Sequence, residues 1–397
     1  MDNLQDRPLV EALRSAGPGD RSALLDKLHT RLLTEQRFKT DLKAMTAKLP
    51  DSKYLDYIRH IDAPDLESTI LVQIPAYQDS ELPKTIQSAR AQAANPDRII
   101  FAICLQDSEE NKHMLDGIPN LRYTFIPIDQ ASGSCRARWE CQELYDGEDY
   151  VLITDSHMRF ARFWDVMEIA QWKACGDEKA ILSEYAADYS SLLNESVGSD
   201  RFTEAAKPFG RYVGALYFLN GSCMLCMWGR GGVFRSERPM LGAFTGCAHV
   251  FGRGEINDIR FDPGMCFHGD EFIMAARWWT HGFNIYHPFM RYVFHLYGPT
   301  PEARAKRQVQ AGHSRKYDIP GPDGVTPREK ELARAEQLFG IASHGIDLGA
   351  YGLGAERGLD EYERFSGVSV KNRTYRVFSR LGPFGGDHTP EESELFG

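Results

Sequence analysis

The first sixty residues carry apolar side chains at intervals of three and four positions, with charged side chains between them. Residues 9–16 (LVEALRSA) and residues 21–45 (RSALLDKLHTRLLTEQRFKTDLKAM) both show this spacing, which gathers the apolar residues on one face of an α-helix. Residues 17–20 (GPGD) interrupt the pattern, because glycine and proline are typical of turns. The sequence therefore predicts an N-terminal helical region over residues 1–66.

From residue 68 the pattern changes to short apolar runs that alternate with helical stretches. The runs cover residues 70–75, 99–105, 123–128 and 150–154, and helical spacing covers residues 82–94 and 136–145. Buried strands separated by helices are typical of a mostly parallel sheet with helices on both faces. Ligands of such sheets bind beyond the carboxyl ends of the strands. Polar residues follow each run, within segments 76–79 (AYQD), 106–107 (QD), 129–130 (DQ) and 155–157 (DSH).

The second half of the chain is less regular. Residues 201–265 are rich in glycine and aromatic residues, which favours irregular strands and loops around a site. We expect a helix over 270–282, a strand over 285–294, and a loop over 299–330, which is rich in proline, glycine and basic residues. Two short helices are expected over 328–339 and 359–365. The chain therefore divides into the helical region, an α/β domain over 67–298, and a loop with a C-terminal extension over 299–397.

Composition and charge exclude several classes of protein. The 397 residues are 42% hydrophobic and 26% charged, which allows a large core and excludes general disorder. No apolar run reaches the ~18 residues of a membrane-spanning helix, and the N-terminus lacks the layout of an export signal. The net charge of −10 disfavours a nucleic-acid-binding protein.

Eight cysteines in a chain of this length do not form a disulfide framework. Several lie in apolar segments, so we interpret them as reduced thiols that pack as small hydrophobic residues in the cytoplasm. One CxxC pair, Cys223 and Cys226, has no second pair that could complete a zinc site. We therefore expect it to be part of a packed strand or helix.

The run 150–154 delivers Asp155 and, two residues later, His157. Residues two apart in an extended chain point in the same direction, so both side chains can share one ligand. A carboxylate and an imidazole suit a divalent transition metal such as Mn²⁺, and a metal there can neutralise a diphosphate. The alternative is a capping aspartate followed by a surface histidine.

Residues 155–160 (DSHMRF) resemble the variant DxD motif of nucleotide-sugar glycosyltransferases with the GT-A fold. The chain is more narrowly similar to the GlcNAc-transferase family whose eukaryotic members modify hydroxyproline on a cytosolic ubiquitin-ligase subunit. The resemblance covers residues 68–370 and implies a GT-A fold with an N-terminal helical addition and a C-terminal cap. It rests on segments in one order, namely 73–79 (QIPAYQD), 83–86 (PKTI), 133–138 (GSCRAR), 144–150 (LYDGEDY), 261–263 (FDP), 269–271 (GDE), 277–282 (RWWTHG), 294–297 (FHLY), 353–354 (LG) and 359–367 (LDEYERFSG).

A remoter similarity to the polypeptide GalNAc-transferases implies roles for the metal ligands. By that comparison Asp155, His157 and His295 are the three protein ligands of Mn²⁺ or another divalent cation. Asp270 and Glu271 are the catalytic candidates, and Asp270 stands where both families usually have glutamate. The side chain of Asp270 is one methylene shorter than that of glutamate, which leaves its exact contact open.

The resemblance also implies a donor site for a UDP-sugar. Its residues are Pro75, Ala76, Tyr77, Asp79, Gln106, Arg136, Arg138, Asp155, Ser156 and Gly246. Pro75 and Tyr77 would hold uracil, although both residues also suit the end of a strand. The two arginines would contact the diphosphate, because guanidinium forks match phosphate oxygens; otherwise they are solvated helix charges. Gly246 allows either a tight turn or a close approach of the backbone to the sugar.

The implied reaction moves N-acetylglucosamine from UDP-GlcNAc to a hydroxyl acceptor, a protein, glycan or small molecule, with retention of the α configuration. An inverting transferase would instead use Asp270 or Glu271 as a general base. A donor-binding module without turnover is the alternative from another class. A two-metal phosphatase or nuclease is disfavoured because the sequence shows no second carboxylate cluster.

Overall fold

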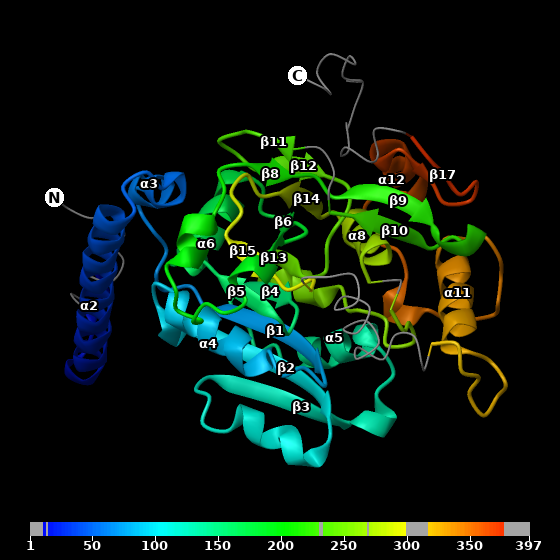
Figure 1. Cartoon of the computed structure of the whole chain (residues 1–397), viewed down its shortest axis with the longest axis horizontal. Coiled ribbons are helices and arrows are strands. Elements are labelled where there is room, and N and C mark those ends of the chain that lie inside the picture. Colours follow the sequence, from blue (N-terminus) through cyan, green and yellow to red (C-terminus); the bar gives the residue numbers. More distant parts are fainter. Residues whose placement is uncertain (1–10, 13–14, 230–232, 268–269, 299–316, 377–397) are drawn as a thin grey trace.

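The computed structural model has a large β-sheet at its centre with helices packed on both faces (Figure 1). It describes residues 11–376 except 13–14, 230–232, 268–269 and 299–316. Alternate residues of a strand face opposite sides of its sheet. Ile70, Val72 and Ile74 accordingly pack in one core cluster with helices α4 (Leu82–Gln92) and α6 (Trp164–Ala174). Leu71 faces the opposite cluster, which contains residues of helix α8 (Phe272–Thr280).

The central sheet has eight strands in the order β12-β14-β6-β13-β4-β1-β2-β3. Neighbouring strands β4, β1, β2 and β3 are parallel, as are β14 and β6, whereas β13 and β12 run antiparallel to their neighbours. The expected α/β class with a mostly parallel sheet is confirmed. The strands of this sheet are β1 (Ile70–Tyr77), β2 (Ile99–Asp107), β3 (Leu121–Pro127), β4 (Tyr150–Thr154), β6 (Ala180–Ser183), β12 (Met240–Gly242), β13 (His249–Arg253) and β14 (Asn284–His287).

Smaller sheets lie beside the large one. The strands are β5 (Met158–Phe160), β7 (Ala187–Asp188) and β15 (Val293–His295) in one sheet, β8 (Gly210–Arg211) with β11 (Val233–Phe234), β9 (Gly214–Phe218) with β10 (Leu225–Trp228), and β16 (Val368–Ser369) with β17 (Thr374–Tyr375). The α-helices are α2 (Pro18–Lys48), α3 (Lys53–Arg59), α4 (Leu82–Gln92), α5 (Ser134–Glu143), α6 (Trp164–Ala174), α7 (Arg201–Ala205), α8 (Phe272–Thr280), α11 (Pro327–Leu338) and α12 (Leu359–Ser366). Single 3₁₀ segments cover Pro96–Arg98, Glu109–Leu115, Ile128–Gln130, Ser190–Leu192, Leu219–Gly221, Gly254–Asp258 and Gly349–Tyr351.

The single strand expected over 285–294 is wrong. Residues 284–287 form β14 of the large sheet, and residues 293–295 form β15, which pairs with β5 and β7 in another sheet. Pro288 follows β14 directly, and proline cannot donate a backbone hydrogen bond inside a sheet. The chain therefore leaves the large sheet there, and this crossing places His295 next to the loop after β4.

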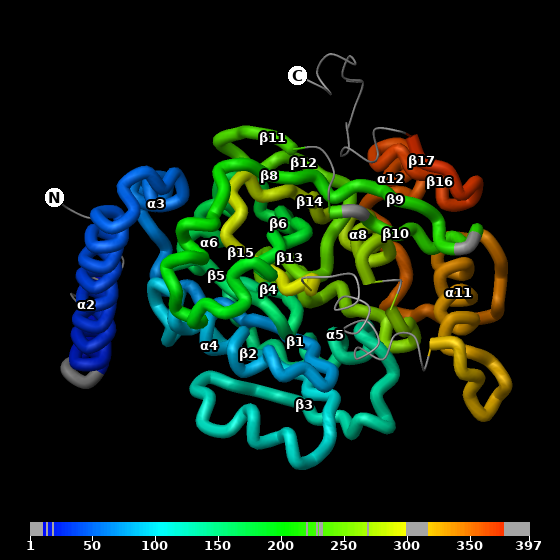
Figure 2. Tube along the Cα trace, in the orientation of Figure 1, coloured from blue at the N-terminus to red at the C-terminus, as the bar shows by residue number. Residues whose placement is uncertain are grey.

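The two ends of the described chain lie on opposite sides of the molecule (Figure 2). Helix α2 begins at Pro18, inside the expected break, because proline is well tolerated in the first turn of a helix. Helices α11 and α12 contribute Ala335, Leu338 and Tyr362 to a second core cluster that includes α8. The three-part division of the chain stays a prediction, as does the loop over 299–330, of which 299–316 lie outside the described residues.

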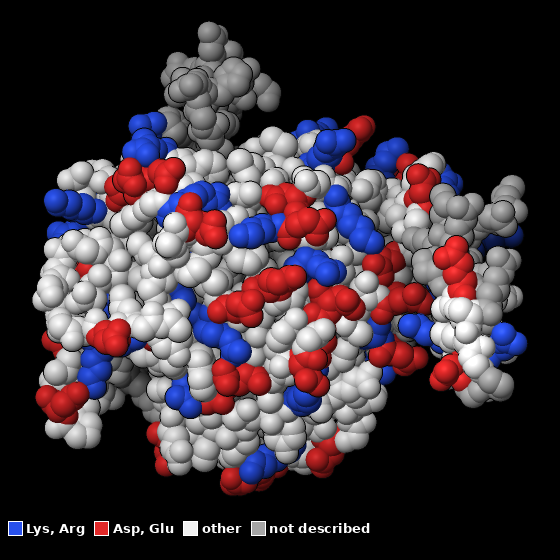
Figure 3. Space-filling view, turned by 180° about the vertical axis from the view of Figure 1, so that it is seen from behind, with Lys and Arg blue, Asp and Glu red and all other residues white. Residues whose placement is uncertain are grey.

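Surface charge and thiols complete the description. Basic and acidic side chains are intermingled on the face seen from behind (Figure 3). All eight cysteines are free, and Cys223 is buried beside β10 while Cys226 lies within it. Among the described residues, none of the helices is both long enough and apolar enough to span a bilayer.

Candidate active site

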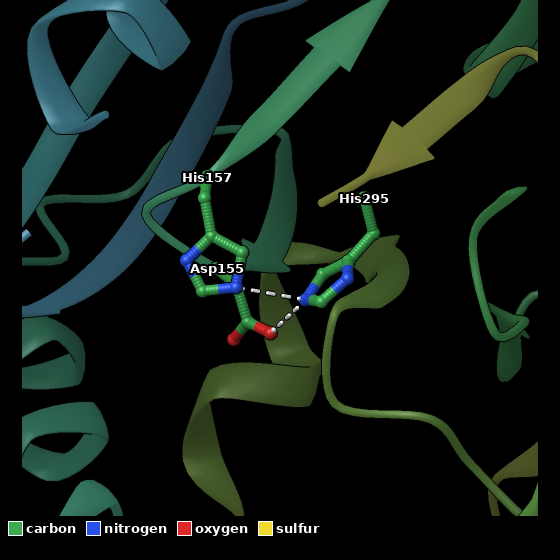
Figure 4. Close-up of side chains that lie close together, drawn as sticks. All are labelled: Asp155, His157 and His295. Carbon is green, nitrogen blue, oxygen red and sulfur yellow. Dashed lines mark hydrogen bonds and ion pairs between the residues drawn. The ribbon is translucent and has the colours of Figure 1, made fainter. Parts of the chain in front are cut away.

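Asp155, His157 and His295 lie together at the carboxyl edge of the large sheet (Figure 4). Asp155 directly follows the buried strand β4, and His157 directly precedes β5. Strand β15 pairs antiparallel with β5 so that His295 lies opposite Met158. The Nε2 atom of His295 is 2.9 Å from Nε2 of His157 and 3.2 Å from Oδ2 of Asp155. Sheet register thus brings together residues that are 140 positions apart.

These three side chains form a donor set that suits a divalent transition metal. Their ligand atoms all lie within 4.8 Å of one another. Ligands about 2.1 Å from a common cation lie about 3 Å apart when they are adjacent, which matches the two separations. Burial raises the pKa of Asp155, but hydrogen bonding with His295 and the charge of Arg138 outweigh it and hold that pKa well below its usual range. Asp155 is therefore a carboxylate that can bind a cation.

Asp79 supports this cluster from the end of β1. Its Oδ2 atom accepts hydrogen bonds from Nδ1 of His157 and from Oγ of Ser156, both at 2.7 Å. Burial raises the pKa of Asp79, but the hydrogen bond and charge of His157 hold it well below the usual value. A carboxylate only accepts, so Nδ1 of His157 carries the proton and its Nε2 points toward His295.

Helix α5 places its two arginines differently, because residues two apart on a helix do not share a face. Arg138 is buried, and its Nη2 donates to Oδ1 of Asp155 at 2.8 Å, while its Nε lies 3.6 Å from Oδ2 of Asp270. The Nε and Nη1 atoms of Arg138 have no hydrogen-bond partner within the described chain. Arg136 instead pairs with Glu140 and lies over the ring of Trp139. The structure brings Arg138 to the cluster and leaves Arg136 outside it.

Asp270 and Glu271 form the acid side of the site, at the start of α8. Oδ2 of Asp270 accepts a hydrogen bond from Oγ of Ser134 at 3.3 Å. Glu271 is held at both oxygens, by the hydroxyl of Tyr185 at 2.5 Å and by the amide of Cys247 at 3.3 Å. Burial raises the pKa of both carboxyl groups, the charge of Asp270 raises that of Glu271 further, and Asp155 raises that of Asp270. These two acids hold protons more tightly than ordinary carboxyl groups.

The residues expected to bind the nucleotide donor include Pro75, Ala76 and Tyr77 of β1 and Gln106 of β2. Pro75 and Tyr77 are half-buried on one face of β1, whereas Ala76 points the opposite way into the core. Gln106 pairs in register with Tyr77, and its side-chain carbonyl is buried with no partner among the described residues. The structure therefore groups Pro75, Tyr77 and Gln106, and leaves only the backbone of Ala76 available to a ligand.

Gly246 and Ser156 have structural explanations of their own. A β-carbon at Gly246 would lie 2.8 Å from Cδ2 of Tyr185 and 2.9 Å from the carbonyl oxygen of Glu184. Glycine there lets Tyr185 pack where its hydroxyl reaches Glu271. The hydroxyl of Ser156 donates to Asp79 and not toward open space.

Three residues that support the acid side were not among the predicted site residues. Ser134 and Tyr185 bond the two acids directly, and the fully buried Glu331 of α11 accepts from the amide of Phe267 at 2.7 Å, just before the acid loop. Tyr185 lies just beyond the end of β6. If the short apolar run 180–182 had been recognised as a strand, Tyr185 would have been a candidate, because ligands bind beyond the carboxyl ends of strands. Ser134 lies in segment 133–138, on which the resemblance rests, but neither it nor Glu331 could be linked to the acid side from local sequence, because their partners lie 136 and 64 residues away.

Comparison with known proteins gives one family and several remote structures. The family described as "Glycosyltransferase (GlcNAc)" matches residues 118–372, more than half of the chain. A crystal structure of GalNAc-T7 with UDP, GalNAc and Mn²⁺ is 13% identical with a TM-score of 0.40, and the match covers 62% of this chain and 48% of that one. Two structures of S. aureus TarS, residues 1–349, are 13% and 12% identical with TM-scores of 0.37 and 0.35.

These structural similarities are low. The two TarS matches cover 68% and 60% of this chain and 72% and 60% of the TarS chains, and the second TarS structure is a complex with UDP-GlcNAc. The chain spans about half the length of GalNAc-T7. No curated protein matches the chain. The matched segment, residues 118–372, includes Asp155, His157, Asp270, Glu271 and His295. Asp79 lies before the start of this segment.

Proposed function

The chain belongs to the glycosyltransferase (GlcNAc) family, and we propose that it transfers N-acetylglucosamine from UDP-GlcNAc to a hydroxyl acceptor with retention of configuration. The observation that carries the proposal is the convergence of Asp155, His157 and His295 next to the buried, incompletely bonded guanidinium of Arg138. A cation and a guanidinium side by side match the two charges of a nucleoside diphosphate. The mostly parallel sheet and the family match agree with the GT-A fold.

We infer that Mn²⁺ is the cation and that Asp155, His157 and His295 hold it. Imidazole ligands favour Mn²⁺ over Mg²⁺, which prefers oxygen ligands alone. When bound, the metal supplies positive charge that stabilises the UDP leaving group. The chain's own part is to fix two imidazole nitrogens and one carboxylate oxygen at a single edge of the sheet.

The nucleotide would lie along the ends of β1, β2 and β4. Gln106 has a buried side-chain carbonyl with no described partner beside Tyr77, and an amide can pair with the donor and acceptor groups on the edge of uracil. The Nε and Nη1 atoms of Arg138, which have no hydrogen-bond partner among the described residues, would donate to the diphosphate. With an aromatic ring on one side and an amide on the other, we expect the site to prefer a uridine nucleotide.

Retention is proposed from the resemblance to the GlcNAc-transferase family, and the contacts of Asp270 and Glu271 suit a role in holding the sugar. Both oxygens of Glu271 already accept hydrogen bonds, and Asp270 is bonded by Ser134 and lies near Arg138. In the retaining transfer the bond between the anomeric carbon and the phosphate oxygen breaks, the acceptor oxygen bonds to that carbon, and its proton passes to the departing phosphate. Asp270 and Glu271 would then hold the sugar.

The experiment that tests the proposal is a hydrolysis and transfer panel. UDP-GlcNAc, UDP-GalNAc, UDP-glucose and GDP-mannose are incubated with Mn²⁺, Mg²⁺ or EDTA, and released nucleotide is measured. We expect UDP-GlcNAc with Mn²⁺ to be cleaved fastest and EDTA to stop the reaction. Cleavage that is indifferent to EDTA would contradict the metal role.

Product analysis separates the alternatives. Candidate hydroxyl acceptors are screened by mass spectrometry, and NMR reads the anomeric configuration of the product. A β-linked product would reject retention and make Asp270 or Glu271 the base of an inverting enzyme. Tight donor binding with neither hydrolysis nor transfer would indicate a binding module.

We also infer that the chain works in the cytoplasm, which the eight free thiols support.

A further inference from the structure

The carboxylate of Asp79 makes two sets of hydrogen bonds, one with the start of α4 and one with the loop between β4 and β5. Its Oδ1 atom accepts from the amide of Glu81 at 2.9 Å, directly before α4. Its Oδ2 atom accepts from the ring of His157 and from the hydroxyl of Ser156. One oxygen therefore fixes the rotation of the carboxylate, and the other faces the metal cluster.

The backbone before Asp79 is arranged to aim it there. Gln78 has a φ angle of 45°, in the left-handed region that residues with a β-carbon rarely adopt. Its amide donates to the carbonyl of Gln106 at 3.1 Å. Non-glycine residues in this region are strained and persist where surrounding structure holds them. The turn brings the end of β1 over to the loop that follows β4.

We propose that Asp79 is a positioning residue for the metal site, which orients His157 and fixes its tautomer, and not a contact of the donor. This inference rests on the proposed metal-dependent function. A protonated Nδ1 leaves Nε2 of His157 with its lone pair toward His295 and Asp155. Metal-binding histidines commonly donate their other nitrogen to a carboxylate in this way. A carboxylate with Oδ2 already bonded twice is also a poor neighbour for a diphosphate, whose charge has the same sign.

The direct test is the affinity of the whole chain for Mn²⁺ alone, measured by titration with electron paramagnetic resonance. Asp79→Ala should weaken Mn²⁺ binding on the order of 10- to 100-fold. Asp79→Asn keeps an acceptor for Nδ1 but loses the charge, so it should restore part of the affinity. Uridine binding without metal should be unchanged in both variants.

Asp65 provides a matched control before β1. Its Oδ1 accepts from the amide of Glu67 at 3.2 Å, the same contact with the second residue along that Asp79 makes with Glu81. Its Oδ2 accepts from the hydroxyl of Ser68 at 2.9 Å and from Nζ of Lys173 at 3.1 Å, so it makes the same local turn without a histidine. Asp65→Ala should leave Mn²⁺ affinity as in the wild type. Equal losses in Asp65→Ala and Asp79→Ala would mean that the effect is general loosening of the fold, and would overturn the proposal.

A spectroscopic reading addresses His157 itself. In ¹⁵N-histidine NMR of the metal-free chain, with the signal assigned by His157→Gln, His157 should have a protonated Nδ1 and an unprotonated Nε2. In Asp79→Ala the two tautomers should mix. Wild-type Mn²⁺ affinity in Asp79→Ala, or a loss confined to uridine binding, would overturn the positioning role. A chain that binds Mn²⁺ through Asp79-oriented His157 but cleaves no UDP-sugar would instead reject the proposed function.

Discussion

The metal side and the acid side of the site lie at the same sheet edge but treat their carboxyl groups in opposite ways. On the metal side, Asp79 and Asp155 have lowered pKa values because histidines and Arg138 surround them. On the acid side, Asp270 and Glu271 have raised pKa values because burial is reinforced by neighbouring acids. We propose a division of labour, in which the carboxylates with lowered pKa values serve the metal and the diphosphate, and the two acids with raised pKa values lie where the sugar would bind.

The largest effect is expected on the metal side, from His295→Ala. Loss of one of three protein ligands should lower metal-dependent cleavage of UDP-GlcNAc roughly 10³-fold, because the metal contributes several kcal/mol of charge stabilisation. The control is His281→Ala at the end of α8, where the Nδ1 of His281 only donates to the carbonyl of Arg277. Circular dichroism checks that both variants fold. Equal activity of the two variants would contradict the assignment of His295 as a metal ligand.

The second-largest effect is expected from the two arginines of α5, Arg136 and Arg138, of which only Arg138 contacts the metal cluster. Arg138→Ala should weaken UDP affinity on the order of 10- to 100-fold, because a charge-assisted, paired contact is lost and Asp155 and Asp270 lose their shared cation. Arg136→Ala removes only a partly exposed pair with Glu140 and should change the affinity less than about twofold. Calorimetric titration of UDP with Mn²⁺ measures both variants. A larger loss in Arg136→Ala would reverse the assignment.

On the acid side, Tyr185→Phe leaves one oxygen of Glu271 without its hydroxyl donor. We expect kcat to fall about tenfold, since an unsatisfied buried acceptor costs about 1–3 kcal/mol, with Mn²⁺ affinity unchanged. Tyr286→Phe is the matched control, because that hydroxyl also donates to a carboxylate, Asp177, before β6 and away from the site. If Tyr185→Phe weakened Mn²⁺ binding as strongly as it lowered kcat, the acids Asp270 and Glu271 would not act independently of the metal cluster, and the proposed division would be contradicted.

The smallest effect is a pH dependence of stability in the presence of EDTA. A raised pKa of Glu271 in the folded chain means that the unfolded chain loses this proton first as pH rises. This contribution to the unfolding free energy is complete below about pH 4 and is lost as pH rises toward 8. Glu271→Gln should therefore reduce the fall in unfolding free energy between about pH 4 and pH 8 by an amount on the order of 1 kcal/mol. Urea unfolding at several pH values measures this. An unchanged slope would contradict the raised pKa.

The sequence predicted the metal side better than the acid side for a physical reason. Asp155 and His157 follow one apolar run, so their meeting depends only on a strand and its period, and His295 came from the resemblance. Ser134, Tyr185 and Glu331 act through partners that are far away in the chain, and contacts of this kind are invisible to local patterns. The interruption at Pro288 shows the same limit, because the pattern favours one strand where the chain changes sheets.

The central claim is that Asp155, His157 and His295 bind one divalent cation that in turn holds UDP. Calorimetric titration of UDP, with Mn²⁺ and with EDTA, tests it in the wild type, in Asp155→Asn and in His295→Ala. The account predicts that Mn²⁺ strengthens UDP binding in the wild type and that this gain disappears in both variants. An undiminished Mn²⁺-dependent gain in both variants would contradict it.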